Sequence, residues 1–367
     1  MVIAGGGTGG HLYPGVAVAR ELLARQAGAQ VSFAGTAQGI EARVIPREGF
    51  ALDLIRSGGL KGKSLAARAR GAVLVPVGLF DAWRIVSARR PSLVIGVGGY
   101  SSGPVVLVAA IRGIPTMVLE QNAAPGLTNR LVAPLVKAAA VTFESTRAFF
   151  GSKAFVSGNP VRPEFFAPAG STQESAHDDE MPVHAATAGV GVLVFGGSQG
   201  AHAINVAMVE AAARLAADPH LHLTHQTGER DVELVRTAYR AAGLQAEVEA
   251  FLFDMGRRLR QADVVVCRAG ATTLAEIAAA GKPSILIPLP TATDDHQRKN
   301  AEALAAVGAA EILPQSEVTG AVLAQRILAL ARDPARRQRI ASAAKQLARP
   351  DAAKVIVDRA LELVRRG

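Results

Sequence analysis

The sequence contains a single cysteine, Cys267, which excludes an internal disulfide and is typical of a protein in a reducing compartment. Aromatic residues make up only 4% of the 367 residues, and they do not alternate with basic residues as in single-stranded nucleic-acid sites. No apolar run reaches the length of about 18 residues that a membrane-spanning helix needs, and no signal peptide precedes the first predicted strand. We therefore expect a cytoplasmic protein without membrane-spanning helices and without a nucleic-acid partner.

Positive charge is concentrated in the first half of the chain. Residues 1–160 hold 17 Lys and Arg against 7 Asp and Glu, whereas the remainder holds 23 against 24. This asymmetry indicates an anionic partner for the first half only. The length and the apolar content of 49% allow two domains with large cores.

Residues 264–276 combine a buried strand with the start of a helix. The apolar run 264–267 predicts a strand of a parallel sheet, Gly270 predicts a tight turn, and Thr272 or Thr273 is expected to cap the following helix. Such a turn directs backbone N–H groups toward a phosphate. Glu276 would repel a phosphate but can accept hydrogen bonds from both hydroxyls of a ribose. The stretch thus indicates a nucleoside diphosphate site, and the alternative is an ordinary βα unit with a solvated Glu276.

Glycine-rich turns follow predicted strands in both halves of the chain. Gly5, Gly7 and Gly10 satisfy the pattern G-x-G-x-x-G, and a helix is expected from Pro14 to about residue 26. The second strand, 30–34, is followed by no carboxylate before Glu41, which argues against a nicotinamide dehydrogenase. A similar turn at 196–202 opens the second half. The alternation of strands and helices predicts an α/β protein with two Rossmann-like domains, whose parallel sheets face across a cleft.

The predicted domains are residues 1–160, a linker at 161–190, residues 191–340, and closing helices at 341–367. The segment 167–191 lacks periodicity and is predicted to be a disordered insertion. Its histidines and acidic residues are not expected to bind a metal, because nothing there would fix their geometry.

His11 ends the first glycine-rich turn and is a candidate general base. An imidazole with a pKa near neutrality can take a proton from a sugar hydroxyl. The alternative is a histidine that bonds the backbone at a helix start.

Residues 58–90 place basic residues next to an apolar run that includes the only tryptophan. One interpretation is a pair of core helices with a solvated basic face. The other is an interfacial patch for anionic lipid, in which four basic residues contribute about 1 kcal/mol each, or about 4 kcal/mol together. The predicted patch comprises Lys61, Lys63, Arg68, Arg70, Leu79, Phe80 and Trp83.

Eight motifs, in order along essentially the whole chain, resemble those of the bacterial lipid I GlcNAc transferases of peptidoglycan synthesis, the MurG family. They are GGTGGH (6–11), GGY (98–100) with SGP (102–104), EQN (120–122), GLTN (126–129), GNPVR (158–162), GGSQGA (196–201), RAGATTLAE (268–276), and HQ (296–297) with NA (300–301). The resemblance implies a GT-B fold and an inverting enzyme. It would transfer GlcNAc from UDP-GlcNAc to the 4-hydroxyl of MurNAc in lipid I, giving lipid II and UDP.

The resemblance also assigns residues to the two substrates. Glu276 would hold the ribose, Ser198 and the backbone of Ala271, Thr272 and Thr273 the diphosphate, and Phe251 with the Leu252 backbone the uracil. Arg162, Asn129 and Gln297 would face the donor's phosphate or GlcNAc. Thr8 and Gly9 are also assigned to the donor, and Thr8 would lie on the acceptor side as well. That side comprises Gly10, His11, Tyr100 and Ser101, and His11 is the candidate catalytic base.

The sequence departs from the family pattern at a few positions. Ala269 stands where the family often has Ser, Thr272 where Leu is common, and the 167–191 insertion is long. Asp294 and Asp295 form an acidic pair, but we expect no obligatory metal or other cofactor, because helix N-termini and cations stabilise the departing UDP in this fold class.

The remaining expectations concern location and rival functions. The implied location is the cytoplasmic face of the bacterial cell membrane, with anionic inner-leaflet lipids and other cell-wall synthesis proteins as partners. The rival functions are a UDP-GlcNAc 2-epimerase of the same fold and a non-catalytic UDP-sugar-binding membrane scaffold.

Overall fold

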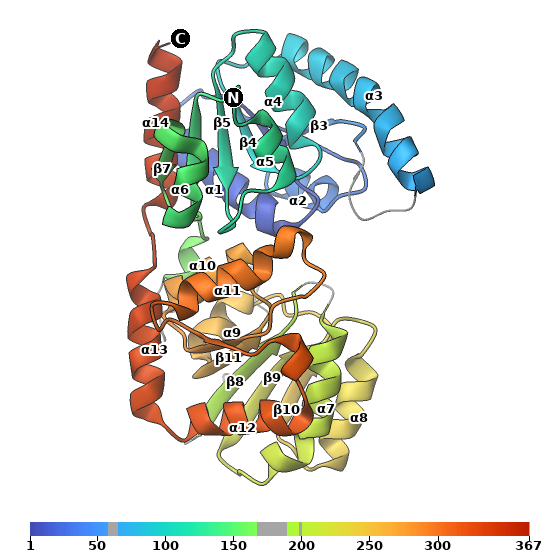
Figure 1. Ribbon diagram of the computed structural model, residues 1–367, viewed down its shortest axis with the longest axis vertical. Helices are drawn as coiled ribbons and strands as arrows, with labels where there is room; N and C mark the ends of the chain where they lie inside the picture. The colour runs from blue at the N-terminus through green and yellow to red at the C-terminus, as the bar shows by residue number, and fades with distance from the viewer. Residues whose placement is uncertain (58–64, 167–188, 198–199, 367) are drawn as a thin grey trace. The chain divides into compact units, whose positions relative to one another are not determined.

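The computed structural model describes residues 1–57, 65–166, 189–197 and 200–366 (Figure 1). These residues form two compact units, one of residues 1–161 with 349–367 and the other of residues 162–348. Each unit contains a parallel sheet with helices on both of its faces (Figure 1). The predicted fold class, two α/β domains with parallel sheets, is confirmed.

The first unit contains, among its described residues, a seven-stranded sheet of order β3-β2-β1-β4-β5-β6-β7. Its strands are β1 (Val2–Gly5), β2 (Ser32–Gly35), β3 (Ala51–Leu54), β4 (Val94–Gly98), β5 (Thr116–Glu120), β6 (Ala138–Val141) and β7 (Ala154–Val156). Its helices are α1 (Gly9–Arg25), α2 (Glu41–Arg47), α3 (Leu65–Arg89), α4 (Ser102–Ile111), α5 (Leu127–Val132), α6 (Glu144–Phe150), the short η1 (Gly151–Lys153) and α14 (Ala352–Arg366).

The second unit contains a six-stranded sheet of order β10-β9-β8-β11-β12-β13 within the described part of the chain. Its strands are β8 (Val190–Phe195), β9 (Leu221–Gln226), β10 (Ala246–Glu249), β11 (Val264–Cys267), β12 (Ser284–Leu286) and β13 (Glu311–Ile312). Its helices are α7 (His202–Ala216), α8 (Val232–Ala241), α9 (Met255–Gln261), α10 (Ala271–Ala280), α11 (His296–Ala305), α12 (Gly320–Ala331), α13 (Pro334–Gln346) and the short η2 (Pro163–Phe165), η3 (Thr293–Asp295) and η4 (Gln315–Glu317).

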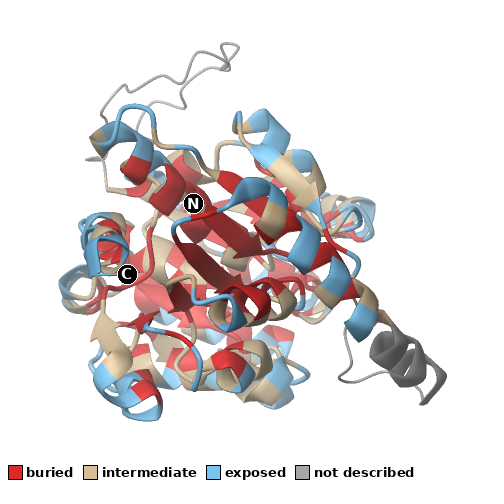
Figure 2. Ribbon diagram, turned by 90° about the horizontal axis from the view of Figure 1, so that it is seen from above, coloured by how far each residue is buried: buried red, intermediate tan, exposed pale blue. Residues whose placement is uncertain are grey.

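The central strands are buried on both faces. In β1, Val2 and Ala4 belong to one apolar core, whereas Ile3 between them belongs to another. Figure 2 shows the central strands buried and most exposed residues on the outer sides of the helices. Because both faces are covered, the strands read in sequence as continuous apolar runs rather than as alternating patterns.

Two predicted helix starts are wrong. Helix α1 begins at Gly9 and contains Pro14, because the carbonyl of Thr8 already accepts from the N–H groups of His11 and Leu12. Helix α10 begins at Ala271 with Gly270 as its N-cap, so Thr272 lies inside the first turn rather than at the cap.

The closing helices at 341–367 pack on different partners. Helix α13 packs against α10 of the second unit, whereas α14 packs against α1 of the first. Residues 167–188, which make up most of the predicted linker at 161–190 and of the predicted insertion at 167–191, lie outside the described residues.

Candidate active site

Both sheets reverse their strand order next to a glycine-rich turn. In the first unit β1 pairs with both β2 and β4, and in the second β8 pairs with both β9 and β11. Ligands of open α/β sheets bind at the carboxyl ends of the strands where this reversal occurs. The turns after β1 and β4, and those after β8 and β11, are therefore the candidate sites.

His11 lies in the first turn of α1 and is oriented by a side chain that follows β5. Its Nδ1 lies 3.1 Å from Oε1 of Gln121, and Nε2 of Gln121 donates to the carbonyl of Val97 at 3.1 Å. Gly98 makes room for the ring, since a Cβ at this position would lie 2.9 Å from Nδ1, and its φ of +96° also favours glycine. The imidazole is thus held by a side chain and not by the backbone of its own helix.

The other residues predicted for the acceptor side lie at the same two turns. Thr8 is the N-cap of α1, although its side chain makes no capping hydrogen bond, and Gly9 and Gly10 begin the helix. After β4, the side chain of Tyr100 is 47% exposed, whereas Ser101 is buried. The structure therefore brings these predicted residues together at the β1–β4 reversal.

Asn129 is committed to the interior of the first unit. Its Nδ2 donates to the carbonyl of Leu119 and to Oε2 of Glu120, both at 2.9 Å. The buried Glu120 also accepts from the N–H groups of Asn122 and Gly126. These bonds turn the amide nitrogen of Asn129 away from a ligand and leave its oxygen, an acceptor that is unsuited to a phosphate.

Helix α10 places its first turn at the carboxyl end of β11. The backbone N–H groups of Ala271, Thr272 and Thr273 belong to this turn, for which the helix itself offers no acceptors. Together with the positive end of the helix dipole they make an environment suited to an anion.

Glu276 lies on α10 next to a cation. Its Oε1 is 4.0 Å from Nη2 of Arg162, whose Nη1 is 3.2 Å from Oε1 of Glu164. The Glu276 side chain is 16% exposed, and its burial raises its pKa to about 7, with Arg162 opposing the shift and Glu164 adding to it. A buried carboxylate with such a shifted pKa is a candidate functional group.

Phe251 and Leu252 follow β10 and are held by the end of β9. The N–H of Leu252 donates to Oε1 of Gln226 at 2.9 Å, and Nε2 of Gln226 donates to the carbonyl of Gly197 at 2.9 Å. The half-exposed Phe251 packs against Phe253 with ring centroids 4.9 Å apart. Gln226 therefore joins the second glycine-rich turn to the aromatic edge.

Gln297 and the acidic pair lie on the segment after β12. Oε1 of Gln297 accepts the N–H of Leu289 at 3.0 Å. Asp295 pairs with Arg298, and no group of three or more His, Cys, Asp or Glu that could hold a metal is found in the described ranges.

The predicted lipid patch is described in part. Lys61 and Lys63 lie outside the described residues, as does Ser198, which was predicted to bind the donor. Arg68 and Arg70 lie on α3. The side chains of Phe80 and Trp83 are 59% and 51% exposed, and Leu79 is half-buried against the core.

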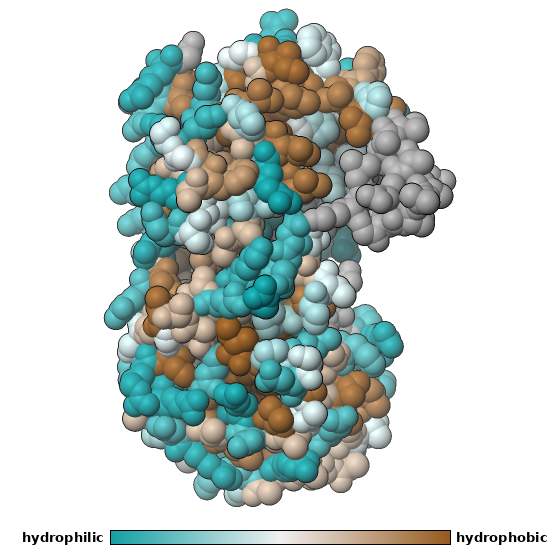
Figure 3. All heavy atoms as spheres, viewed as in Figure 1, coloured by the Kyte–Doolittle hydropathy of each residue, from teal (hydrophilic) through white to brown (hydrophobic). Residues whose placement is uncertain are grey.

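Helix α4 adjoins this part of α3. It ends in the exposed Ile111, and Cζ of the adjacent Arg112 lies 4.9 Å from the ring centroid of Trp83. Figure 3 shows hydrophobic residues gathered over α3 and α4 on this face of the first unit. Of the helices that are described, none is long and apolar enough to cross a bilayer.

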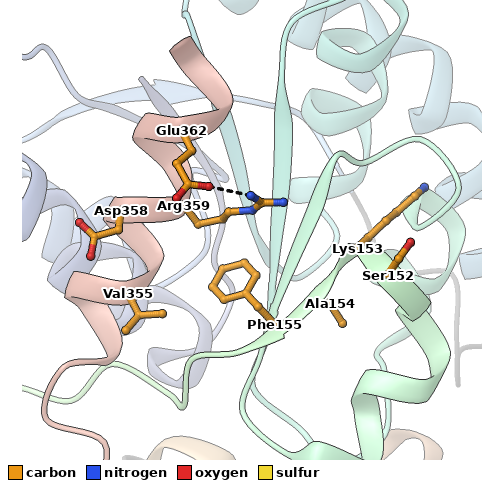
Figure 4. A pocket seen from close by; sticks show the side chains of 8 residues that line it. All are labelled: Ser152, Lys153, Ala154, Phe155, Val355, Asp358, Arg359 and Glu362. Atoms are coloured by element: carbon orange, nitrogen blue, oxygen red, sulfur yellow. Dashed lines mark hydrogen bonds and ion pairs between the residues drawn. The ribbon is translucent and has the colours of Figure 1, made fainter. Parts of the chain in front are cut away.

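A separate hollow of about 340 Å³ lies between β7 and α14 (Figure 4). Phe155 and Val355 form its apolar part, and Arg359 pairs with Glu362 at 2.7 Å. It contains none of the predicted site residues.

Glu41, Gln121 and Gln226 are site-shaping residues that the motifs did not assign. Two of them could have been found from the sequence, because Gln121 and Gln226 lie at the carboxyl ends of predicted strands. Ligands of parallel sheets bind at these strand ends, so a polar residue there is a candidate site residue. The partners of each are residues distant in the sequence, which local patterns do not specify.

Comparisons with known proteins agree with this arrangement. The chain matches the glycosyltransferase family 28 N-terminal domain over residues 1–141 and the C-terminal domain over residues 191–356. It is 48% identical to a UDP-N-acetylglucosamine–N-acetylmuramyl-(pentapeptide) pyrophosphoryl-undecaprenol N-acetylglucosamine transferase of Anaeromyxobacter sp. (strain K), over 100% of this chain and 93% of the relative.

Solved structures show the same fold. The crystal structure of Acinetobacter baumannii MurG has 32% identity and a TM-score of 0.78, over 98% of both chains. A UDP-N-acetylglucosamine 2-epimerase has 13% identity and a TM-score of 0.66, over 98% of this chain and 94% of that one, which shows a shared fold alone. The chain therefore belongs to glycosyltransferase family 28 and, within it, to the MurG family of N-acetylglucosaminyltransferases.

Proposed function

We propose that the protein transfers GlcNAc from UDP-GlcNAc to the MurNAc 4-hydroxyl of lipid I, giving lipid II and UDP in peptidoglycan synthesis. The observation that carries this proposal is the 48% identity over the whole chain to a relative named for this reaction. The site geometry supports it, because one unit offers an anion-binding helix start with a carboxylate beyond it and the other offers an oriented imidazole.

The second unit is proposed to bind the donor. The first turn of α10 would hold the diphosphate, Glu276 would accept from the ribose hydroxyls, and Phe251 would pack on the uracil. Because the N–H of Leu252 already donates to Gln226, the base would meet this residue through its carbonyl. As the bond between the anomeric carbon and the phosphate oxygen breaks, negative charge grows on UDP, and the helix N–H groups with Arg162 would stabilise it.

The first unit is proposed to activate the acceptor through His11. Gln121 presents its oxygen to Nδ1, because its amide nitrogen is used on the carbonyl of Val97. The ring proton of the neutral imidazole then resides on Nδ1, which leaves the lone pair on Nε2. Nε2 would take the proton of the MurNAc 4-hydroxyl as its oxygen attacks the anomeric carbon and inverts it.

The acceptor is a lipid, which agrees with a membrane-docking surface on the first unit. We propose that Phe80, Trp83 and Ile111 enter the membrane interface at the cytoplasmic face of the cell membrane. The basic residues predicted for the patch would attract anionic inner-leaflet lipids. Other cell-wall synthesis proteins remain proposed partners.

Replacing Phe80 and Trp83 with serine should weaken binding to anionic vesicles by about tenfold or more, since burying one large apolar side chain contributes about 1.5–3 kcal/mol. Vesicle sedimentation measures this, and turnover of a water-soluble lipid I analogue should be unchanged. Leu234→Ser, at an exposed position of α8, is the matched control. If the double variant sedimented with vesicles as the wild type does, this face would not be the membrane-docking surface.

The affinity for UDP should fall as the pH is lowered from about 8 to about 6, because Glu276 gains a proton near pH 7 and loses acceptor capacity. Calorimetric titration with UDP at several pH values measures the change. Protonation of UDP itself affects binding to the wild type and to the Glu276→Gln variant equally. The glutamine cannot titrate, so the UDP affinity of the variant should depend less on pH. If the UDP affinities of the two proteins changed equally with pH, Glu276 would not contact UDP.

UDP release from UDP-GlcNAc, measured with and without a lipid I analogue, tests the function directly. Release only with the analogue, with GlcNAc recovered on it, is the expected result. Consumption of the donor without acceptor would favour an epimerase or a hydrolase, and binding without turnover would favour a scaffold.

A further inference from the structure

Glu41, the first residue of α2, is a carboxylate without solvent exposure and without an ion pair to any described residue. Its Oε2 accepts the N–H of Gly7 at 2.8 Å. Its Oε1 accepts both the N–H and the hydroxyl of Thr36, each at 2.8 Å. Three donors thus converge on one buried negative charge, which is the environment that a charged acceptor needs.

This carboxylate occupies the place where the glycine-rich turn of a dinucleotide-binding domain meets a phosphate. The N–H of Gly7 is bonded to Glu41, and that of Gly6 points to the carbonyl of Gly98 at 3.4 Å. A phosphate at this turn would have to replace these bonds and would also meet a like charge within a few ångströms.

The neighbouring glycines are explained by the same group. A Cβ at Gly6 would lie 2.5 Å from the carboxyl of Glu41, and a Cβ at Gly35 would lie 2.5 Å from its Cγ. These two glycines therefore make room for a side chain of the protein itself.

We propose that Glu41 is a positioning residue for the transfer reaction and the built-in anion of the first glycine-rich turn. By holding Gly7 it fixes the path into Thr8 and the first turn of α1, which carries His11. The acceptor's diphosphate accordingly binds outside the Gly5–Gly7 segment. The expected effect on turnover rests on the proposed function. The exclusion of phosphate from the turn does not depend on it.

The charge and shape of Glu41 both matter to this role. In Glu41→Gln the amide can present its oxygen to Gly7 or to Thr36 but not to both, so its NH₂ group would face a buried donor. The turn would shift, and misplacement of a catalytic group by about 1 Å costs up to about 100-fold in rate.

The kinetic test compares Glu41→Gln with Glu48→Gln, which removes the same charge at the other end of α2, where Glu48 pairs with Arg20 on the surface. We expect kcat to fall about 10- to 100-fold in Glu41→Gln, with KM for UDP-GlcNAc within about threefold and the control unchanged. A merely structural role would instead lower the melting temperature and the amount of folded enzyme, with kcat per folded molecule preserved. Preserved kcat would overturn the proposal.

A second test does not depend on catalysis. In protein labelled with ¹⁵N-glycine, inorganic pyrophosphate should leave the amide signals of Gly6 and Gly7 unmoved in the wild type and shift them in Glu41→Ala. A shift of these signals in the wild type would show that the turn binds pyrophosphate and would overturn the proposal, whether or not the protein is a transferase. If the Glu41 variants do not fold, Thr36→Val, which removes one of the three bonds, should lower kcat in the same direction by a smaller factor. Unchanged kcat in Thr36→Val would then overturn the proposal.

Discussion

The His11→Ala variant is expected to lose about 10²- to 10⁴-fold in turnover, the range that general acid–base catalysis contributes. Its affinity for UDP should change by less than about threefold, because most of the proposed donor contacts lie in the second unit. Initial rates with a lipid I analogue give turnover, and calorimetric titration with UDP gives affinity. The expected split follows from the geometry, since Gln121 fixes Nδ1 and leaves Nε2 for the attacking hydroxyl.

His220→Ala is the matched control for this variant, because His220 is exposed on the turn before β9. It should retain full turnover. Equal losses of turnover and UDP affinity in His11→Ala, or a lowered melting temperature that accounts for the loss, would show that His11 supports the structure instead.

The central strands were predictable because parallel strands covered on both faces are apolar throughout. The run 264–267 was predicted as a strand and is β11. Burial dictates such runs locally, so their positions follow from the sequence without knowledge of their neighbours.

Helix starts were less predictable because proline and threonine each have more than one acceptable position. Pro14 suits a first turn, yet in α1 it is accommodated five residues after the start. Threonine is a good N-cap, but Gly270 takes the cap of α10 with extended backbone angles. The preference of a single residue is small beside the tertiary contacts that place the whole helix.

The side-chain pairings were not predictable from local patterns. Glu41 reaches Gly7 across 34 residues, His11 reaches Gln121 across 110, and Leu252 reaches Gln226 across 26. The sequence showed glycine-rich turns, but only the fold shows that a carboxylate of the protein itself lies against the first of them.

Substitution of Glu276 by alanine should weaken UDP binding by about 1.5–3 kcal/mol, the contribution of hydrogen bonds to a charged group. This corresponds to an increase of about 10- to 150-fold in the dissociation constant, measured by calorimetric titration. If the lost bonds are those to the ribose, 2′-deoxy-UDP should bind the wild type more weakly than UDP does, and Glu276→Ala should discriminate less between the two ligands.

Glu164→Ala is the matched control, because Glu164 is the other carboxylate beside Arg162 and it raises the pKa of Glu276. Its removal should leave the discrimination between UDP and 2′-deoxy-UDP in place. Unchanged UDP affinity in Glu276→Ala would place the ribose elsewhere.

Stability distinguishes a ligand-binding Glu276 from a structural one. Burial raises the pKa of Glu276 to about 7, so above that pH the folded protein holds a carboxylate that water would solvate better. The native state binds this proton more tightly than the unfolded state does, and the group's contribution to stability therefore falls as the pH rises from the ordinary value of 4.5 through about 7. Removing the side chain should leave the free energy of unfolding at pH 8 unchanged or raised, whereas a structural carboxylate would lower it when lost. Such a result would agree with the proposal that Glu276, in the helix that begins at the carboxyl end of β11, is there to bind the ribose.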